Sequence, residues 1–172
     1  IKIVNEIYKE AKREGNEPQL IKSLIYRISL QSQFEEEHLE NAIYTFEKEL
    51  ETARVPENQI LHSLVAELYQ WYYQQNRWQI NERGIVIDFE QKDISTWDAV
   101  MINKKIRNHY LESILNHDQI ANIELEDFDA ILNVEDKKGL TLWPSLYDLL
   151  GNRVLDYFLT SESGLADIGS LK

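Results

Sequence analysis

The chain has no cysteine, and this absence excludes several kinds of site. None of its 172 residues supplies a thiol that could act as a nucleophile, form a disulfide, or hold zinc or an iron–sulfur cluster. The cellular compartment stays open, because a domain of this size folds without disulfides inside or outside the cell.

Long apolar runs are absent as well. No stretch approaches the roughly 18 consecutive apolar residues that a membrane-spanning helix needs. The first residue is Ile1, and no charged segment followed by an apolar one resembles a secretion signal. We therefore expect an excised fragment or a processed mature piece, whose targeting cannot be read from the sequence.

Proline and glycine are scarce, with three and six copies, whereas 43% of the residues are apolar. Such a composition favours a packed, folded chain over a disordered one. We predict one domain over residues 1–160. Residues 161–172, with Gly164 and Gly169, are expected to be a linker or the start of a following domain.

Basic residues are in the minority, 18 against 30 acidic ones, and the formal net charge is −12. A field of this sign repels phosphate backbones and anionic lipid surfaces. The charge therefore argues against nucleic acid, or a membrane surface, as the partner.

Apolar residues recur at helical spacing along most of the chain, which predicts an all-α fold. The helix that begins at Pro56 is apolar on more than one face, so we expect it to lie at the centre. The expected helices span residues 1–14, 18–31, 56–76, 95–115, 118–123, 125–132 and 144–158, with a further one beginning near Ser32.

The first four helices form two hairpins offset by about 36 residues, a length typical of tetratricopeptide repeats. Ile7 recurs as Ile43, and Ile25 as Leu61. The consensus Gly and Ala of true tetratricopeptide repeats are missing. We therefore predict stacked antiparallel helical hairpins, a tetratricopeptide-like α-solenoid or bundle, and not membership of that family.

Residues 77–94 interrupt the helical pattern with the short β-prone run 84–89, which predicts an ordered loop. Three helix starts carry capping signals. Ser32 with Glu35 and Ser95 with Asp98 fit capping boxes, and Asp118 fits a helix N-cap.

No catalytic or metal-binding constellation is recognisable. Glu35-x-x-His38 has the spacing of a di-metal carboxylate bundle, but the second copy is missing. His117-Asp118 lacks the separated ligands that a metal-dependent phosphohydrolase needs. The acidic run 124–136 has neither the alternating ligands nor the glycine of an EF-hand. We predict no enzyme activity, no cofactor and no metal site.

An aromatic cluster around residues 69–78 is the one ambiguous signal. Large aromatic residues on a central helix typically anchor its packing, and the same side chains can form a platform for sugars or peptides. The candidate interaction or ligand surface comprises Trp71, Gln74, Gln75, Arg77, Trp78 and Trp97.

Several motifs give the chain a family resemblance. The chief ones are LHSLVAELY at 61–69, WYYQQNRW at 71–78 and ISTWD at 94–98, and the others are YKEAK at 8–12, PQLIKSL at 18–24, FDAIL at 128–132 and PSLYD at 144–148. With these motifs the chain resembles the N-terminal helical region of large bacterial cell-envelope proteins of the α2-macroglobulin family.

The resemblance implies an accessory module of a protease-inhibiting envelope protein, located in the periplasm or anchored at the cell surface. The family's thioester needs a cysteine, and its bait region needs a cleavable segment; this chain has neither. The predicted function is a non-catalytic scaffold that contacts a protein partner or other domains of its own chain. The alternative is a sugar- or peptide-binding helical domain that uses the Trp/Tyr cluster.

Overall fold

The computed structural model describes residues 1–31, 38–83, 93–124 and 144–159. Every regular element in these ranges is helical, and the one β contact there is an isolated bridge between Glu124 and Ser145. The all-α prediction is confirmed. The described helices are α1 (Lys2–Glu14), α2 (Glu17–Gln31), α3 (His38–Leu50), α4 (Glu57–Glu82), the 3-10 helix η1 (Ile94–Thr96), α5 (Ala99–Ser113), α6 (His117–Ile120) and α9 (Leu146–Leu159).

Helices α1 and α2 pack side by side across a tight connection. Gly15 ends α1 in a left-handed conformation, with φ 67°, which glycine adopts without steric cost. Asn16 then caps α2, because its side-chain oxygen accepts a hydrogen bond of 3.1 Å from the backbone N–H of Gln19. The first helical hairpin is therefore fixed by two adjacent residues.

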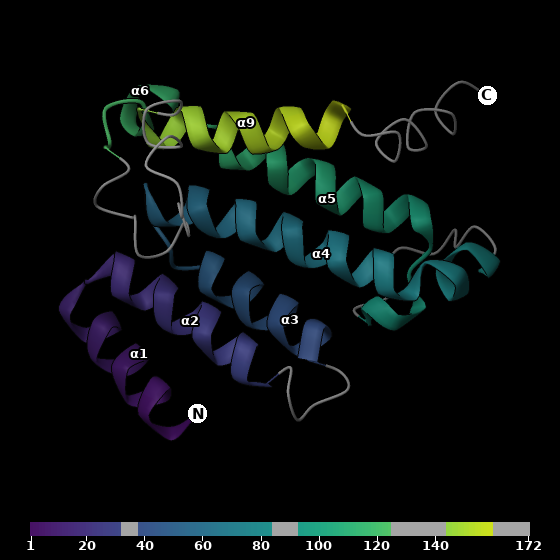
Figure 1. The fold of residues 1–172 in the computed structure, drawn as a ribbon, viewed down its shortest axis with the longest axis horizontal. Helices are drawn as coiled ribbons and strands as arrows, with labels where there is room; N and C mark the ends of the chain where they lie inside the picture. Colours follow the sequence, from purple (N-terminus) through teal and green to yellow (C-terminus); the bar gives the residue numbers. More distant parts are fainter. Residues whose placement is uncertain (32–37, 84–92, 125–143, 160–172) are drawn as a thin grey trace.

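Helix α4 is the central element, as predicted (Figure 1). It packs against α3 on one side and α5 on the other, and also touches α2 and α9. Its buried side chains accordingly lie on more than one face, and include Leu61, Val65, Tyr69 and Tyr73. No helix in the described ranges, α4 included, has the uninterrupted apolar length that crossing a bilayer requires.

The predicted end of α4 at Asn76 is wrong, because the helix continues to Glu82. The apolar side chain of Ile80 lies fully buried and extends the core by a further turn. Beyond the helix, the guanidinium of Arg83 donates a hydrogen bond of 2.8 Å to the backbone carbonyl of Trp97. The predicted loop over 77–94 is thus helical at its start, and its segment 84–92 lies outside the described residues.

The start of α5 differs from the predicted capping box. The 3-10 helix η1 precedes it, capped by Asp93, which accepts a hydrogen bond of 2.9 Å from the N–H of Ser95. Asp98 is the N-cap of α5 and accepts a hydrogen bond of 2.8 Å from the N–H of Met101. Ser95 therefore belongs to η1, and Asp98 caps the helix alone.

Helices α6 and α9 also begin differently from the sequence predictions. Asn116, at φ 61°, is the N-cap residue of α6, so the predicted N-cap Asp118 lies within the helix. Helix α9 begins with a reciprocal box that the sequence analysis missed. The hydroxyl and the backbone N–H of Ser145 both donate hydrogen bonds to the Asp148 carboxylate. The backbone N–H of Asp148 donates in return to the Ser145 hydroxyl.

Some predictions fall outside the described residues. They are the capping box at Ser32 and Glu35, the helix over 125–132 and the tail 161–172.

Candidate functional site

Five of the six predicted surface residues lie on the second half of α4. Trp71 is 46% exposed and Trp78 is 79% exposed, so both present aromatic surface to solvent. Trp97 does not belong with them. It is 7% exposed, and its ring stacks on that of buried Tyr69 with centroids 6.0 Å apart. The inclusion of Trp97 in the predicted surface is corrected, because its ring is part of the core.

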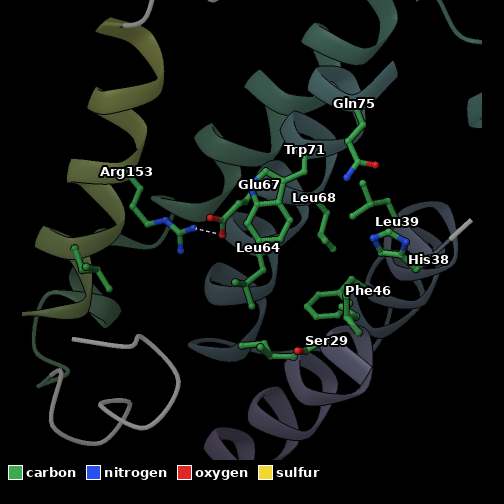
Figure 2. A pocket seen from close by; sticks show the side chains of 13 residues that line it. Ser29, His38, Leu39, Phe46, Leu64, Glu67, Leu68, Trp71, Gln75 and Arg153 are labelled. Carbon is green, nitrogen blue, oxygen red and sulfur yellow. Dashed lines mark hydrogen bonds and ion pairs between the residues drawn. The ribbon is translucent and has the colours of Figure 1, made fainter. Parts of the chain in front are cut away.

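A groove opens beside Trp71, between α4 and its neighbours on both sides (Figure 2). Its volume is about 640 Å³, which is within the range of ligand-binding clefts. The lining is mostly apolar and comes from four helices: Ile25, Ile28 and Ser29 of α2, His38, Leu39 and Phe46 of α3, Leu64, Glu67, Leu68, Trp71 and Gln75 of α4, and Leu149 and Arg153 of α9.

The floor of the groove is one stripe of α4. Leu64, Leu68, Trp71 and Gln75 follow one another at spacings of three and four residues, which places them on the same face of the helix. Trp78 continues this spacing toward the end of α4. The stripe from Leu64 to Gln75 is about 16 Å long at 1.5 Å per residue.

An ion pair lies in the wall of the groove. Arg153 of α9 donates to the Glu67 carboxylate of α4 at 2.5 Å, and both side chains are partly buried (Figure 2). Because the two charges neutralise each other, an occupant of the groove does not have to supply a counter-charge to either of them.

A second hollow, of about 630 Å³, lies at the C-terminal end of α4. Gln75 lines both hollows, so the groove and the surface around Trp78 are contiguous along the helix. The lining residues of the second hollow are Gln74, Gln75, Arg77, Trp78, Asn81 and Glu82. Five of the predicted surface residues, all except Trp97, therefore line one or both hollows.

A partly buried polar cluster joins α3, α4 and α5, and no signal in the sequence pointed to it. The Nδ1 atoms of His62 and His109 lie 2.9 Å apart, a distance that requires one nitrogen to donate and the other to accept. On the other side of His109, its Nε2 lies 3.7 Å from the Glu47 carboxylate. Tyr69 and Lys105 donate hydrogen bonds to the same carboxylate oxygen at 2.8 and 3.2 Å.

The cluster shifts the pKa of three of its members. Burial and, after it, the charge of the neighbouring His109 together lower the pKa of His62 to about 4. Burial and the Glu47 carboxylate raise the pKa of Tyr69. Burial alone would raise the pKa of Glu47, but His109, Tyr69 and Lys105 outweigh it and hold this pKa at about 2. At neutral pH the cluster therefore contains a neutral His62 and an ionised Glu47.

The contacts of this cluster run between helices. His62, His109 and Glu47 line neither the groove nor the hollow at the end of α4. In the described part of the chain, no three acidic or histidine side chains converge on a common point, as a metal ion would require. The cluster ties three helices together through hydrogen bonds.

The fold and the groove together define an all-helical domain with an open, mostly apolar cleft along its central helix. A comparison with protein-family models, curated protein sequences and solved structures finds no match. The resemblance to the α2-macroglobulin envelope proteins therefore stays a prediction.

Part of the groove could not have been found from sequence. Arg153 follows its partner Glu67 by 86 residues, and no local pattern relates the two. The wall from α2 and α3 consists of residues such as Ile28 and Leu39, whose spacing predicts burial against a neighbour. The part of the groove that the sequence does indicate is the surface of α4. Aromatic residues occur around this helix, and its neighbours do not cover all of them.

Proposed function

We propose that this chain is a non-catalytic protein-interaction module that binds an amphipathic helix of a partner protein in the groove along α4. The observation that carries the proposal is Trp71. This large aromatic side chain is 46% exposed at the edge of an apolar groove, next to the solvent-facing Trp78. Exposed Trp in a concave apolar surface is typical of interface hot spots.

The shape of the groove supports a helix as the occupant. Its floor is itself a helix, and its walls come from α2 and α3 on one side and from α9 on the other. A further helix laid on the α4 stripe would complete a layer of packed helices, with its apolar residues at helical spacing against Leu64, Leu68 and Trp71.

The charges of the groove and of the whole chain favour a partner helix with an uncharged inner face and a basic outer face. The full charges in the groove wall, Glu67 and Arg153, neutralise each other, so the buried face of the occupant should be uncharged. The chain as a whole carries −12, so a basic outer face on the partner helix would speed its association.

The test is a binding titration with a defined probe. The probe is a fluorescent 18-residue peptide of about five helical turns, with leucines along one face and lysines along the other. We expect saturable binding by fluorescence anisotropy, and Trp71→Glu should weaken it at least about tenfold, because a charge would replace an aromatic ring in the floor of the groove.

The matched control is Leu155→Glu. Leu155 of α9 is 61% exposed and does not line the groove, so the same change of character there should leave the affinity within about twofold. Equal losses in the two variants, or no saturable binding by the unaltered chain, would contradict the proposal. Circular dichroism of each variant establishes that it is folded.

A second candidate function is sugar binding at the end of α4. The observation that favours it is the 79% exposure of Trp78 beside the amides of Gln74 and Asn81, since an aromatic face with nearby amides is suited to hydroxylated rings. Titration with soluble envelope polysaccharides, followed by Trp fluorescence, tests it. A response that persists in Trp78→Ala would rule this surface out.

The same proposal includes the wider setting implied by the sequence motifs. The module would be a tetratricopeptide-like stack of hairpins within a larger envelope protein of the α2-macroglobulin type, and it would hold a partner or a neighbouring domain of its own chain. What supports this setting is the series of motifs quoted above and the side-by-side packing of α1 with α2 and of α3 with α4.

A further inference from the structure

A third cavity, a cleft, lies among α1, α2 and α3. It has a volume of about 560 Å³ and a mainly polar lining that includes Asn5, Tyr8 and Lys12 of α1, Arg27 of α2, and Lys48 and Glu49 of α3. Three basic side chains thus face one carboxylate. This balance is opposite in sign to that of the whole chain, which carries −12.

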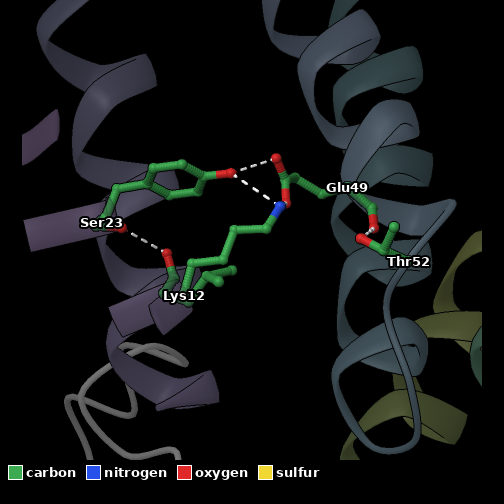
Figure 3. Close-up of polar contacts among 6 residues, drawn as sticks. Lys12, Ser23, Glu49 and Thr52 are labelled. Atoms are coloured by element: carbon green, nitrogen blue, oxygen red, sulfur yellow. Dashed lines mark hydrogen bonds and ion pairs between the residues drawn. The ribbon is translucent and has the colours of Figure 1, made fainter. Parts of the chain in front are cut away.

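The single carboxylate in the cleft is already neutralised. Glu49 is 8% exposed, accepts a hydrogen bond from the Tyr8 hydroxyl, and pairs with the Lys12 ammonium at 2.7 Å (Figure 3). Lys12 therefore cancels Glu49, and these contacts also fasten α1 to α3 across the cleft. The two remaining cations, Arg27 and Lys48, determine the charge that the cleft presents.

Neither remaining cation has an acidic partner in the described part of the chain. The guanidinium of Arg27 lies over the Tyr8 ring, 5.2 Å from its centroid, and no carboxylate of the described residues pairs with it or with Lys48. An arginine held against an aromatic face keeps its N–H donors available along the edge of its plane. Arg27 and Lys48 can therefore donate charge-assisted hydrogen bonds to an anion.

We propose that the cleft between α1 and α3 binds a small organic oxyanion, a phosphate ester or a carboxylate. The anionic group accepts hydrogen bonds from Arg27 and Lys48. The volume fits such a molecule, because small-molecule sites typically occupy about 300–1,000 Å³. This site is separate from the groove along α4, with which it shares no lining residue.

The test is a titration of the folded chain with three probes at low ionic strength, where charge contacts are least screened. The probes are glycerol 3-phosphate, citrate and inorganic phosphate, and the readout is the backbone amide NMR shifts. We expect saturable shifts clustered around Asn5, Tyr8, Arg27 and Lys48. A preference for glycerol 3-phosphate would identify a phosphate ester as the ligand type, and a preference for citrate a carboxylate.

Variants separate a built site from general attraction. Arg27→Gln and Lys48→Gln should each weaken binding of the preferred probe at least about tenfold, since each removes a charge-assisted hydrogen bond. Lys9→Gln is the matched control, because Lys9 is an exposed cation of α1 that does not line the cleft. Shifts spread over all basic residues, equal losses in the control, or no saturation with any probe would overturn the proposal.

Discussion

Trp71 and Tyr69 are two residues apart on α4, yet their side chains have opposite environments. Tyr69 is 1% exposed and donates to Glu47, whereas Trp71 is 46% exposed and borders the groove. A step of two residues turns a helix by about 200°, which carries a side chain from the core face to the groove face. Size and aromaticity alone therefore do not tell which of the two anchors the fold.

The first prediction concerns the free energy of unfolding of two alanine variants. Tyr69→Ala should lower it by about 3–5 kcal/mol, because a fully buried ring is replaced by a cavity and Glu47 loses a donor. Trp71→Ala should lower it by about 1–2 kcal/mol, since only about half of this side chain leaves a packed surface. Urea unfolding followed by circular dichroism measures both values.

Comparable losses in the two variants would show that Trp71 is a packing anchor after all. A small loss in the free energy of unfolding of Trp71→Ala would show that the fold does not depend on the Trp71 side chain.

At the scale of single helices, a capping side chain marks the start of α5, whereas α6 begins after Asn116 without a side-chain cap. Asp98 is buried, and its carboxylate accepts a hydrogen bond from the N–H of Met101. Asp118 is exposed and lies inside the short α6. The two residues have the same side chain and similar local sequence settings, a polar residue before an apolar stretch. Their environments in the folded chain differ entirely.

The second prediction compares these two aspartates. Asp98→Ala should lower the free energy of unfolding by about 1–2 kcal/mol, because it leaves an N–H of the first turn of α5 without its acceptor. Asp118→Ala should change it by less than about 0.5 kcal/mol, as expected of an exposed side chain. Thermal and urea unfolding of both variants checks the difference; a larger loss for Asp118→Ala would contradict this assignment of the caps.

The helices themselves could be predicted from the sequence, because apolar residues at helical spacing specify both the helix and its apolar face. What the pattern does not specify is whether a neighbour covers that face. Ile3 and Ile7 have the inward spacing of a buried stripe, yet they are 72% and 37% exposed, and Ala11 alone of the three is buried. Ile43, the predicted counterpart of Ile7, is fully buried.

The groove was predictable in part for the same reason. Trp71, Gln75 and Trp78 are on one stretch of one helix, so their spacing revealed a shared surface. The pairs Glu67–Arg153 and His62–His109 join residues that are far apart in the chain. Such contacts depend on how helices are placed in three dimensions, which local periodicity does not encode.

At the scale of the whole molecule, the partly buried polar cluster links three helices and makes their packing depend on protonation. Glu47 comes from α3, His62 and Tyr69 from α4, and His109 and Lys105 from α5. Protonation of whichever of the two facing Nδ1 atoms accepts the hydrogen bond would place two N–H groups against each other at 2.9 Å.

The third prediction is a loss of stability in acid that begins at mildly acidic pH. The pKa of His62 is about 4 in the folded chain and 6.5 when unperturbed, so the unfolded chain takes up this proton first. Stability should be fully present above pH 6.5 and fall as the pH decreases from 6.5 to 4. Glu47, whose pKa is about 2 against a usual 4.5, adds a second loss between pH 4.5 and 2.

Urea unfolding at a series of pH values measures these two losses. His62→Asn should remove the decline between pH 6.5 and 4 and leave the lower one in place, whereas Glu47→Gln should flatten the lower one. His117→Asn is the matched control, because His117 is exposed on the short helix α6. An unchanged pH profile in His62→Asn would show that other groups cause the decline.

Helix α4 carries two sets of side chains, one buried in the core and one lining the groove. Val65, Tyr69 and Tyr73 are enclosed by neighbouring helices, while Leu64, Trp71 and Gln75, interleaved with them along the same chain segment, border open space. Substitutions at the groove positions, every third or fourth residue, can therefore change the groove surface and leave the core intact, whereas an insertion or deletion of one residue within α4 would rotate the two sets into each other's places. The groove surface and the core of this molecule can thus vary independently by substitution, but not by a change in length.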